Sequence, residues 1–122
     1  MKRPFIYIAL PYTHPDKAVR DERMKGFANV AAEIENAGRY HVLSGVLATA
    51  IVERSSIPLP DDYAFWGSYS ESLLRVCEGV VLIPFIGWEK SIGVTAELAL
   101  AKTLNIPIYV HGDEHYRKWV LQ

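Results

Sequence analysis

Three short runs of this chain are apolar at almost every position, without the polar alternation of a strand that has one side in water. They are residues 5–10, 80–84 and 106–110, and segments with helical spacing separate them. Strands that are apolar on both sides are typical of parallel sheets covered on both faces. We therefore expect an α/β fold with a parallel sheet between layers of helices.

The first half of the chain alternates strand and helix signals. Asp16 is expected to cap a helix with an apolar stripe, and Gly38 is expected to end it. The stripe consists of Arg20, Met24, Phe27, Ala31, Ile34 and Ala37. A second strand is expected at 40–44 and a short helix at 46–53, followed by a loop rich in Ser and Pro at 55–60.

The second half repeats the alternation. Asp61 or Asp62 is expected to cap a helix that Gly79 ends, with Cys77 buried near its end. Its stripe is expected to contain Asp62, Trp66, Tyr69, Leu73, Val76 and Cys77. A further helix is expected at about 93–104, ended by Asn105, and a short terminal helix begins at 112–113.

Length and charge limit the classes of function. A chain of 122 residues suits one domain, which we expect to span 1–122. Half of the residues are hydrophobic, 13 are basic and 14 are acidic, and the net charge is −1. Because no basic block stands out, binding to a nucleic-acid polymer through bulk electrostatics is not expected. A small nucleotide needs only a few well-placed donors and stays possible.

Cysteine and histidine usage argues against a metal or disulfide site as the basis of function. Cys77 is the only cysteine, and the 4 histidines show no metal-ligand spacing. We expect no metal and no cofactor. The apolar run that begins at Phe5 is too short for a signal peptide, and no stretch reaches membrane-spanning length. A cytoplasmic protein without membrane contact is the expectation.

The loops after the first and third strands are the expected place of a ligand site. Ligands of open parallel sheets bind beyond the carboxyl ends of the strands, where neighbouring loops face one crevice. These loops are 11–15 and 85–93. The helix after the second loop has an apolar stripe that consists of Val94, Leu98, Ala101 and Leu104, and Glu97 falls inside it.

Glu97 is the main candidate for chemistry. A carboxylate among apolar neighbours in the first turn of a helix, ionised with help from the helix dipole, suits a nucleophile or a general base. A capping box does not explain it, because Val94 stands three residues earlier in place of Ser or Thr. Simple complementation of the helix dipole is the structural alternative.

Residues around the crevice supply further candidates. Gly93 permits close approach of an anion to the helix N-terminus, and Ser91 either contacts a ligand or caps the helix. Trp88 lies in the loop and can stack on a base. Tyr12 offers a hydroxyl, and Tyr7 is either a core residue or points its hydroxyl into the crevice.

Two segments of the chain resemble the nucleoside 2-deoxyribosyltransferase superfamily. The first is Tyr7-Ile8-Ala9-Leu10-Pro11-Tyr12, and the second runs from Gly93-Val94-Thr95-Ala96-Glu97 to Ala101. The likeness is greater to a branch of small bacterial and phage proteins, which carries the sequence from Gly87-Trp88 to Glu97 in similar form. The likeness spans most of the chain.

The resemblance implies a flavodoxin-like, Rossmann-like three-layer fold with four or five parallel strands, and a homodimer or higher homo-oligomer. It implies that Glu97 attacks the anomeric carbon of a 2-deoxynucleoside or its 5′-monophosphate, and that Tyr7 orients Glu97. It places Ser91 where the superfamily contacts the sugar or the 5′-phosphate. The residues expected to contact substrate are Ala9, Leu10, Pro11, Tyr12, Asp62, Glu71, Trp88, Ser91 and Gly93.

One position departs from the superfamily pattern. The superfamily has an aspartate, in the helix before the third strand, that helps protonate the departing base, whereas this chain reads Ser68-Tyr69-Ser70-Glu71-Ser72 there. Glu71 and Asp62 are the nearest carboxylates. Two functions follow as expectations: cleavage or exchange of an N-glycosidic bond, or a nucleotide-binding module without catalysis. A small oligomerising protein without a ligand is the third alternative.

Overall fold

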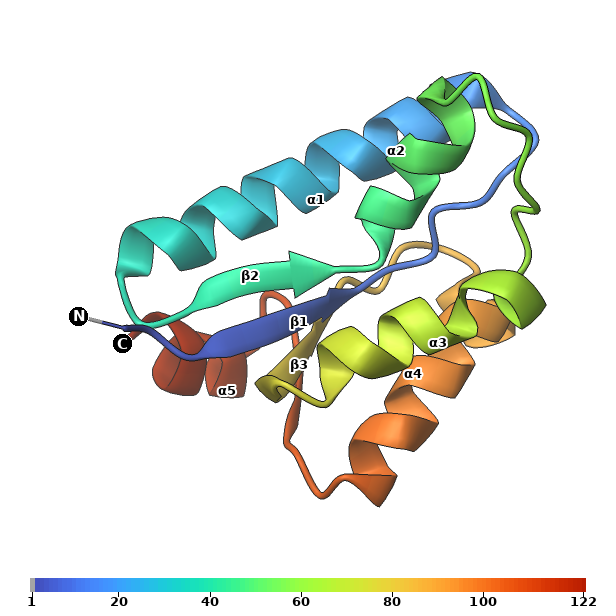
Figure 1. Ribbon diagram of the computed structural model, residues 1–122. Helices are drawn as coiled ribbons and strands as arrows, with labels where there is room; N and C mark the ends of the chain where they lie inside the picture. The colour runs from blue at the N-terminus through green and yellow to red at the C-terminus, as the bar shows by residue number, and fades with distance from the viewer. Residues whose placement is uncertain (1) are drawn as a thin grey trace.

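The computed structural model describes residues 2–122, and its centre is a sheet of four parallel strands in the order β2-β1-β3-β4. The strands are β1 (Phe5–Ala9), β2 (His41–Ser44), β3 (Cys77–Leu82) and β4 (Ile108–Val110). Helices lie on both sides of this sheet, which confirms the α/β, flavodoxin-like three-layer fold (Figure 1). β1 and β3 are neighbours, as the expected crevice requires.

The helices connect the strands and close both faces. They are α1 (Lys17–Ala37), α2 (Val46–Arg54), α3 (Tyr63–Leu74), α4 (Ile92–Thr103) and α5 (Glu114–Tyr116), with short turns η1 (Trp88–Lys90) and η2 (Arg117–Leu121). The expected caps are confirmed: Asp16, Asp62 and Ser91 each accept a backbone N–H of the helix that follows. Gly38 ends α1 with φ of 84°, the left-handed conformation that glycine adopts without strain.

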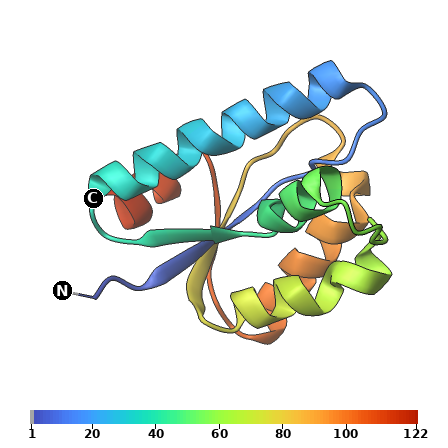
Figure 2. The same cartoon turned by 45° about the horizontal axis from the view of Figure 1, so that its top comes forward.

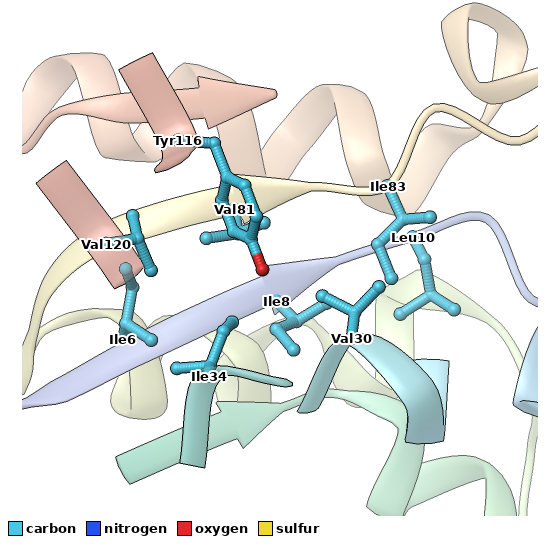
Figure 3. Packing of buried hydrophobic residues seen from close by; sticks show 9 residues of the cluster. All are labelled: Ile6, Ile8, Leu10, Val30, Ile34, Val81, Ile83, Tyr116 and Val120. Atoms are coloured by element: carbon cyan, nitrogen blue, oxygen red, sulfur yellow. The ribbon is translucent and has the colours of Figure 1, made fainter. Parts of the chain in front are cut away.

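One face of the sheet packs against α1 and the C-terminal segment. Even-numbered residues from β1 onward, Ile6, Ile8 and Leu10, point toward this face. Val30 and Ile34 of α1 cover them from one side, and Tyr116 and Val120 cover them from the other (Figure 3). All of these side chains are almost completely buried, so they form the larger part of the core.

The opposite face packs against α3 and α4. Here the odd-numbered residues of β1, Tyr7 and Ala9, join Leu74 of α3 and Ala101 of α4. Figure 2 shows α1 on one side of the sheet and α3 and α4 together on the other. The alternation along β1 therefore decides that Tyr7 faces the layer that carries Glu97.

The expected end of α3 is wrong. The helix ends at Leu74, and Cys77 already belongs to β3, where it pairs with Phe5. Gly79 lies inside this strand, at the shift of register between β1 and β3, and does not terminate a helix. A fully buried strand has no alternation of apolar and polar residues. In the sequence, its first residues therefore fit the apolar stripe of the preceding helix and were assigned to that helix.

Candidate functional site

Tyr7, Ser70 and Glu97 form a buried hydrogen-bonded cluster between the sheet and helices α3 and α4. The Tyr7 hydroxyl donates a hydrogen bond to Oε2 of Glu97, and it lies 3.2 Å from Oγ of Ser70. Because a phenol has one proton, Tyr7 donates only to Glu97, and the Ser70 hydroxyl has one proton of its own to direct to the Tyr7 oxygen or to the carboxylate. All three side chains are buried, and Glu97 is only 8% exposed.

Each member of the cluster is placed by the buried face of its own element. Tyr7 points toward α3 and α4 because the side chains of β1 alternate between the two faces of the sheet. Glu97 shares the buried face of α4 with Val94 and Ala101, at spacings of three and four residues. Ser70 shares the buried face of α3 with Leu74. Three elements from distant parts of the chain therefore converge on one carboxylate.

Gly45, at the start of α2, completes the cluster from a fourth element. A Cβ atom at this position would lie 2.9 Å from the Tyr7 hydroxyl and 3.2 Å from Oγ of Ser70. Oε2 of Glu97 is 3.5 Å from the same point. Only a residue without a side chain permits this approach, and the backbone N–H of Gly45 faces the Tyr7 oxygen.

Burial controls the protonation of the cluster. It raises the pKa of Glu97 to about 7, although the hydrogen bonds from Tyr7 and Ser70 favour the ionised form and act in the opposite direction. Burial, followed by the charge of Glu97, raises the pKa of the Tyr7 phenol far above its ordinary value. Tyr7 is therefore a neutral donor, and Glu97 is near the midpoint of its titration at neutral pH.

The structure corrects two expectations for Glu97, its place in the first turn of the helix and its ionisation by the helix dipole. α4 begins at Ile92 and has no acidic residue in its first turn, so Glu97 lies in the second turn of the helix. The helix dipole acts mainly within the first turn, and desolvation acts against ionisation. Burial rather than the dipole therefore sets the charge of this carboxylate.

Tyr63 is a neighbour of the cluster that the sequence did not reveal. It is the first residue of α3, and its ring approaches to 4.0 Å from the position of a Cβ on Gly93. Burial raises the pKa of its hydroxyl, and the negative charges of Glu97 and Glu71 add to this effect. Its position at the first turn of a helix has no periodic signal, because only later residues define the stripe.

Arg23 of α1 joins the two loops of the expected crevice. Its guanidinium donates to the carbonyl of Thr13 at 3.1 Å and to the carbonyl of Ile86 at 3.1 Å. The loops after β1 and β3 therefore do face each other. In the sequence, Arg23 is one of several charges on an amphipathic helix, and nothing distinguishes it from its neighbours.

The residues expected in the loop after β3 lie near the N-terminus of α4. Trp88 is half-buried in η1. Oγ of Ser91 accepts the N–H of Val94 at 3.2 Å, which makes it the cap of α4. Gly93 lies in the first turn of that helix, against Tyr63. These residues surround the end of α4 that leads to Glu97.

The residues expected after β1 divide between the core and a cavity. The side chains of Ala9 and Leu10 belong to the two hydrophobic clusters, and Pro11 is buried. Tyr12 is half-buried, and its hydroxyl donates to Oε1 of Glu53 at 3.1 Å.

Asp62 and Glu71 have partners outside the cluster. Oδ1 of Asp62 accepts the N–H of Phe65 at 2.9 Å and caps α3. Oε1 of Glu71 accepts a hydrogen bond from Arg75 at 2.8 Å on the surface of α3. Ser70, which lies between them in sequence, is the residue of this segment that points to Glu97.

A cavity of about 520 Å³ lies beside the cluster, at the free edge of β2. Ser44 and Tyr69 line it, and the residues that follow them in the chain, Gly45 and Ser70, contact Tyr7. The cavity and the cluster therefore share walls from β2 and α3. Its volume is in the range of small-molecule sites.

The described part of the chain, residues 2–122, contains no helix long and apolar enough to cross a membrane. It also contains no group of three or more His, Cys, Asp or Glu side chains that could hold a metal ion. Cys77 is buried, and this burial raises the pKa of its thiol to about 12. At neutral pH the thiol is protonated and unreactive.

Comparison with known proteins identifies a family. No curated protein matches the chain. Residues 4–113 match the family described as Domain of unknown function (DUF1937), and this match includes Tyr7, Ser70 and Glu97. Since the match covers the whole sheet, the chain belongs to the DUF1937 family.

Proposed function

We propose that this protein cleaves or exchanges the N-glycosidic bond of a 2-deoxynucleoside or its 5′-monophosphate, with Glu97 as the nucleophile. The observation that carries the proposal is the buried carboxylate of Glu97 in hydrogen-bond contact with Tyr7. Both residues stand at the positions that a resemblance to nucleoside 2-deoxyribosyltransferases assigns to this chemistry.

The proposed reaction has two displacements at one carbon. A carboxylate oxygen of Glu97 attacks C1′ of the deoxyribose, and the bond from C1′ to the base nitrogen breaks with its electron pair on the base. The result is a deoxyribosyl ester of Glu97. Water or a second base then attacks C1′ and gives up a proton, which balances the proton that the departing base takes up. The ester bond breaks, and the carboxylate is restored. Water gives hydrolysis, and a base gives exchange.

Tyr7 and Ser70 fit the needs of such a nucleophile. The Tyr7 phenol keeps its proton, so it holds the carboxylate in one orientation by donating a hydrogen bond and leaves the negative charge on Glu97. The Ser70 hydroxyl, 3.2 Å from the Tyr7 oxygen, supports this arrangement. With a pKa of about 7, a large share of Glu97 is ionised at neutral pH and little water surrounds it.

The test is the release of free base from a panel of deoxynucleosides and deoxynucleoside 5′-monophosphates, followed by chromatography. Release by the wild type and loss of release in Glu97→Gln support the proposal. Glu89→Gln, at an exposed position of η1, is the matched control and is expected to retain activity. Equal release by wild type and Glu97→Gln would exclude Glu97 as the nucleophile.

A second candidate is a nucleotide-binding module without turnover. The observation in its favour is Ser70, which stands in the segment where the superfamily has its aspartate, while Asp62 and Glu71 bond elsewhere. A ligand that binds only the folded state raises the melting temperature. Stabilisation by nucleotides without base release supports the module, whereas base release excludes it.

The proposal includes a homodimer or higher homo-oligomer, as the resemblance implies, and a cytoplasmic location, as the sequence analysis predicts. Leu47 and Ile51 of α2 and Phe65 of α3 are exposed apolar side chains that a second copy can cover. Analytical ultracentrifugation is expected to give the mass of a dimer or a higher oligomer. A monomer at all concentrations would contradict this part of the proposal.

A further inference from the structure

We propose that the cavity at the free edge of β2 holds the base of the substrate, and that Glu53 selects a ring with two adjacent N–H donors, as in guanine. This inference rests on the proposed function, because it takes the sugar to lie at Glu97. It assigns a binding surface and a specificity residue that are separate from the Tyr7, Ser70 and Glu97 cluster.

The walls of the cavity suit a flat, apolar ring. They consist largely of apolar side chains from α1, β2, α2 and α3, among them Met24, Phe27, Leu43 and Leu73. Tyr69 adds an aromatic face. A nucleobase buries its two faces against such surfaces, whereas its polar edge needs hydrogen-bond partners in the plane of the ring.

Two polar side chains of the cavity, Tyr12 and Arg20, meet Glu53. Its Oε1 accepts the Tyr12 hydroxyl at 3.1 Å, and Nε of Arg20 lies 3.7 Å from the same oxygen. Arg20 is in turn fixed by the carbonyls of His14, at 2.6 Å, and Pro15, at 3.2 Å. Glu53 is therefore oriented by two residues before any ligand binds.

The other carboxylate of the cavity is engaged elsewhere. Asp21 forms an ion pair with Lys17 at 2.8 Å, one helical turn away on α1. Glu53 keeps acceptor capacity on Oε2, and on Oε1 beyond the bond from Tyr12. A carboxylate has only acceptors, so it matches an edge of two N–H donors in a bidentate pair.

The distance along α2 supports a single ligand that extends from the cluster to Glu53. Gly45 lies at the cluster, and Glu53 lies eight positions later, which is about 12 Å along a helix. The comparable length in a purine nucleoside runs from the anomeric carbon to the N–H donors at the far edge of the base. With one hydrogen bond added, this length is of the same order as the distance along α2. One end of α2 then borders the cluster, and the other end meets the far edge of the base.

Guanine and hypoxanthine differ at the 2-amino group, which is one of the two donors proposed to face Glu53. Guanine presents N1–H and its 2-amino group side by side, whereas hypoxanthine lacks the 2-amino group. Adenine presents a ring-nitrogen acceptor beside its amino group, and this acceptor would face the carboxylate. A ligand that leaves one carboxylate oxygen unpaired is expected to bind roughly tenfold to a hundredfold more weakly.

The experiment is calorimetric titration of the Glu97→Gln chain, which binds without turnover, with deoxyguanosine 5′-monophosphate and deoxyinosine 5′-monophosphate. The guanine nucleotide is expected to bind at least tenfold more tightly. Adding Glu53→Gln is expected to remove this difference, and Tyr12→Phe to reduce it. Glu22→Gln, exposed on α1 outside the cavity, is the matched control and keeps it. Circular dichroism verifies that each variant is folded.

The outcomes separate the two proposals. Equal affinity for the two nucleotides, or a difference that survives Glu53→Gln, overturns the role of Glu53 and leaves the proposed function standing. If neither nucleotide binds, the cavity proposal fails, and the proposed function fails as well only if the wild type releases no base from any member of the panel.

Discussion

Glu97 is the residue on which the chemistry depends, because it holds a charge where charge is unfavourable. Only 8% of it is exposed, and its neighbours along α4 are Val94 and Ala101. The two hydroxyl groups of Tyr7 and Ser70 offset part of the desolvation. An isolated core position would not retain a carboxylate at this cost, which is the physical reason to connect it with function.

The raised pKa makes the stability of the fold depend on pH. The pKa of Glu97 is about 7 in the folded state, above the ordinary value of 4.5. Its contribution is therefore fully present below the ordinary pKa and is lost as the pH rises through about 7. Relative to Glu97→Gln, the wild type is expected to lose about 3 kcal/mol across this window.

Urea denaturation of both proteins at about pH 5 and about pH 8 measures this difference. Glu78→Gln, at an exposed position of β3, is the control and is expected to follow the wild type. Parallel pH profiles for wild type and Glu97→Gln would show that Glu97 keeps its ordinary pKa in the folded protein.

Ser70 is expected to tune the pH dependence of activity. Its hydroxyl favours the ionised form of Glu97, so Ser70→Ala is expected to shift the acidic limb of the kcat/KM profile to higher pH. The rate is expected to fall roughly 10- to 100-fold, the effect of a hydrogen bond to a charged group. Ser72→Ala, exposed on the same helix, is expected to change neither quantity. An unshifted limb in Ser70→Ala would show that Ser70 has only a structural role.

Gly45 is expected to tolerate no side chain. Gly45→Ala places a methyl group 2.9 Å from the Tyr7 hydroxyl, so the cluster has to move. The expected loss of stability is about 1–3 kcal/mol, together with loss of base release. Gly93→Ala is the contrast: its new Cβ has no neighbour within 4.0 Å except the Tyr63 ring, and α4 is expected to gain up to about 1 kcal/mol. Thermal denaturation of the two variants measures both effects.

Among the elements, those with a clear period or cap were predictable from sequence. The ends of α1 at Asp16 and Gly38 and the stripe of α4 that contains Glu97 are confirmed, whereas the predicted stripe of α1 contained Ile34 but missed Val30, the other buried residue of this helix. The end of α3 was wrong, because the buried strand β3 continues its apolar pattern. Helix and strand cannot be separated there by hydrophobicity, since both are buried.

The site was predictable where one residue contradicts its surroundings. Glu97 is a carboxylate inside an apolar stripe, so the sequence alone makes it a candidate. Ser70 and Tyr63 are ordinary residues for a helix, and only the packing of α3 against α4 brings them near Glu97. Gly45 depends on the approach of α2 to β1, which is a long-range contact without a local signal.

The loops after β1 and β3 are held as a pair by α1. Arg23→Met removes two hydrogen bonds to Thr13 and Ile86, each of which contributes about 1 kcal/mol. The amides of Trp88 and Lys90 in η1 are expected to exchange about fivefold faster with solvent deuterium. Lys25→Met, exposed on α1, is the control. Unchanged exchange in Arg23→Met would show that the loop after β3 is held by other contacts.

Across the whole molecule, the two faces of the sheet differ in the kind of side chains they bury. The face toward α1 and the C-terminal segment is an apolar core with Tyr116 and Val120 as its last members. The face toward α3 and α4 contains the buried polar cluster, and the cavity at the edge of β2 opens beside it. The cluster thus lies on one face of the sheet, whereas the cavity reaches around the edge of β2 to Met24 and Phe27 of α1.

The claim that Glu97 attacks the sugar is tested most directly by trapping the ester. The protein is mixed with a deoxynucleotide that releases base, quenched in acid during turnover, digested, and measured by mass spectrometry. We expect the mass of one 2-deoxyribosyl group, with its phosphate where present, on the peptide that contains Glu97. Base release with this peptide unmodified, or with the group attached to another residue, would contradict the assignment of Glu97 as the nucleophile.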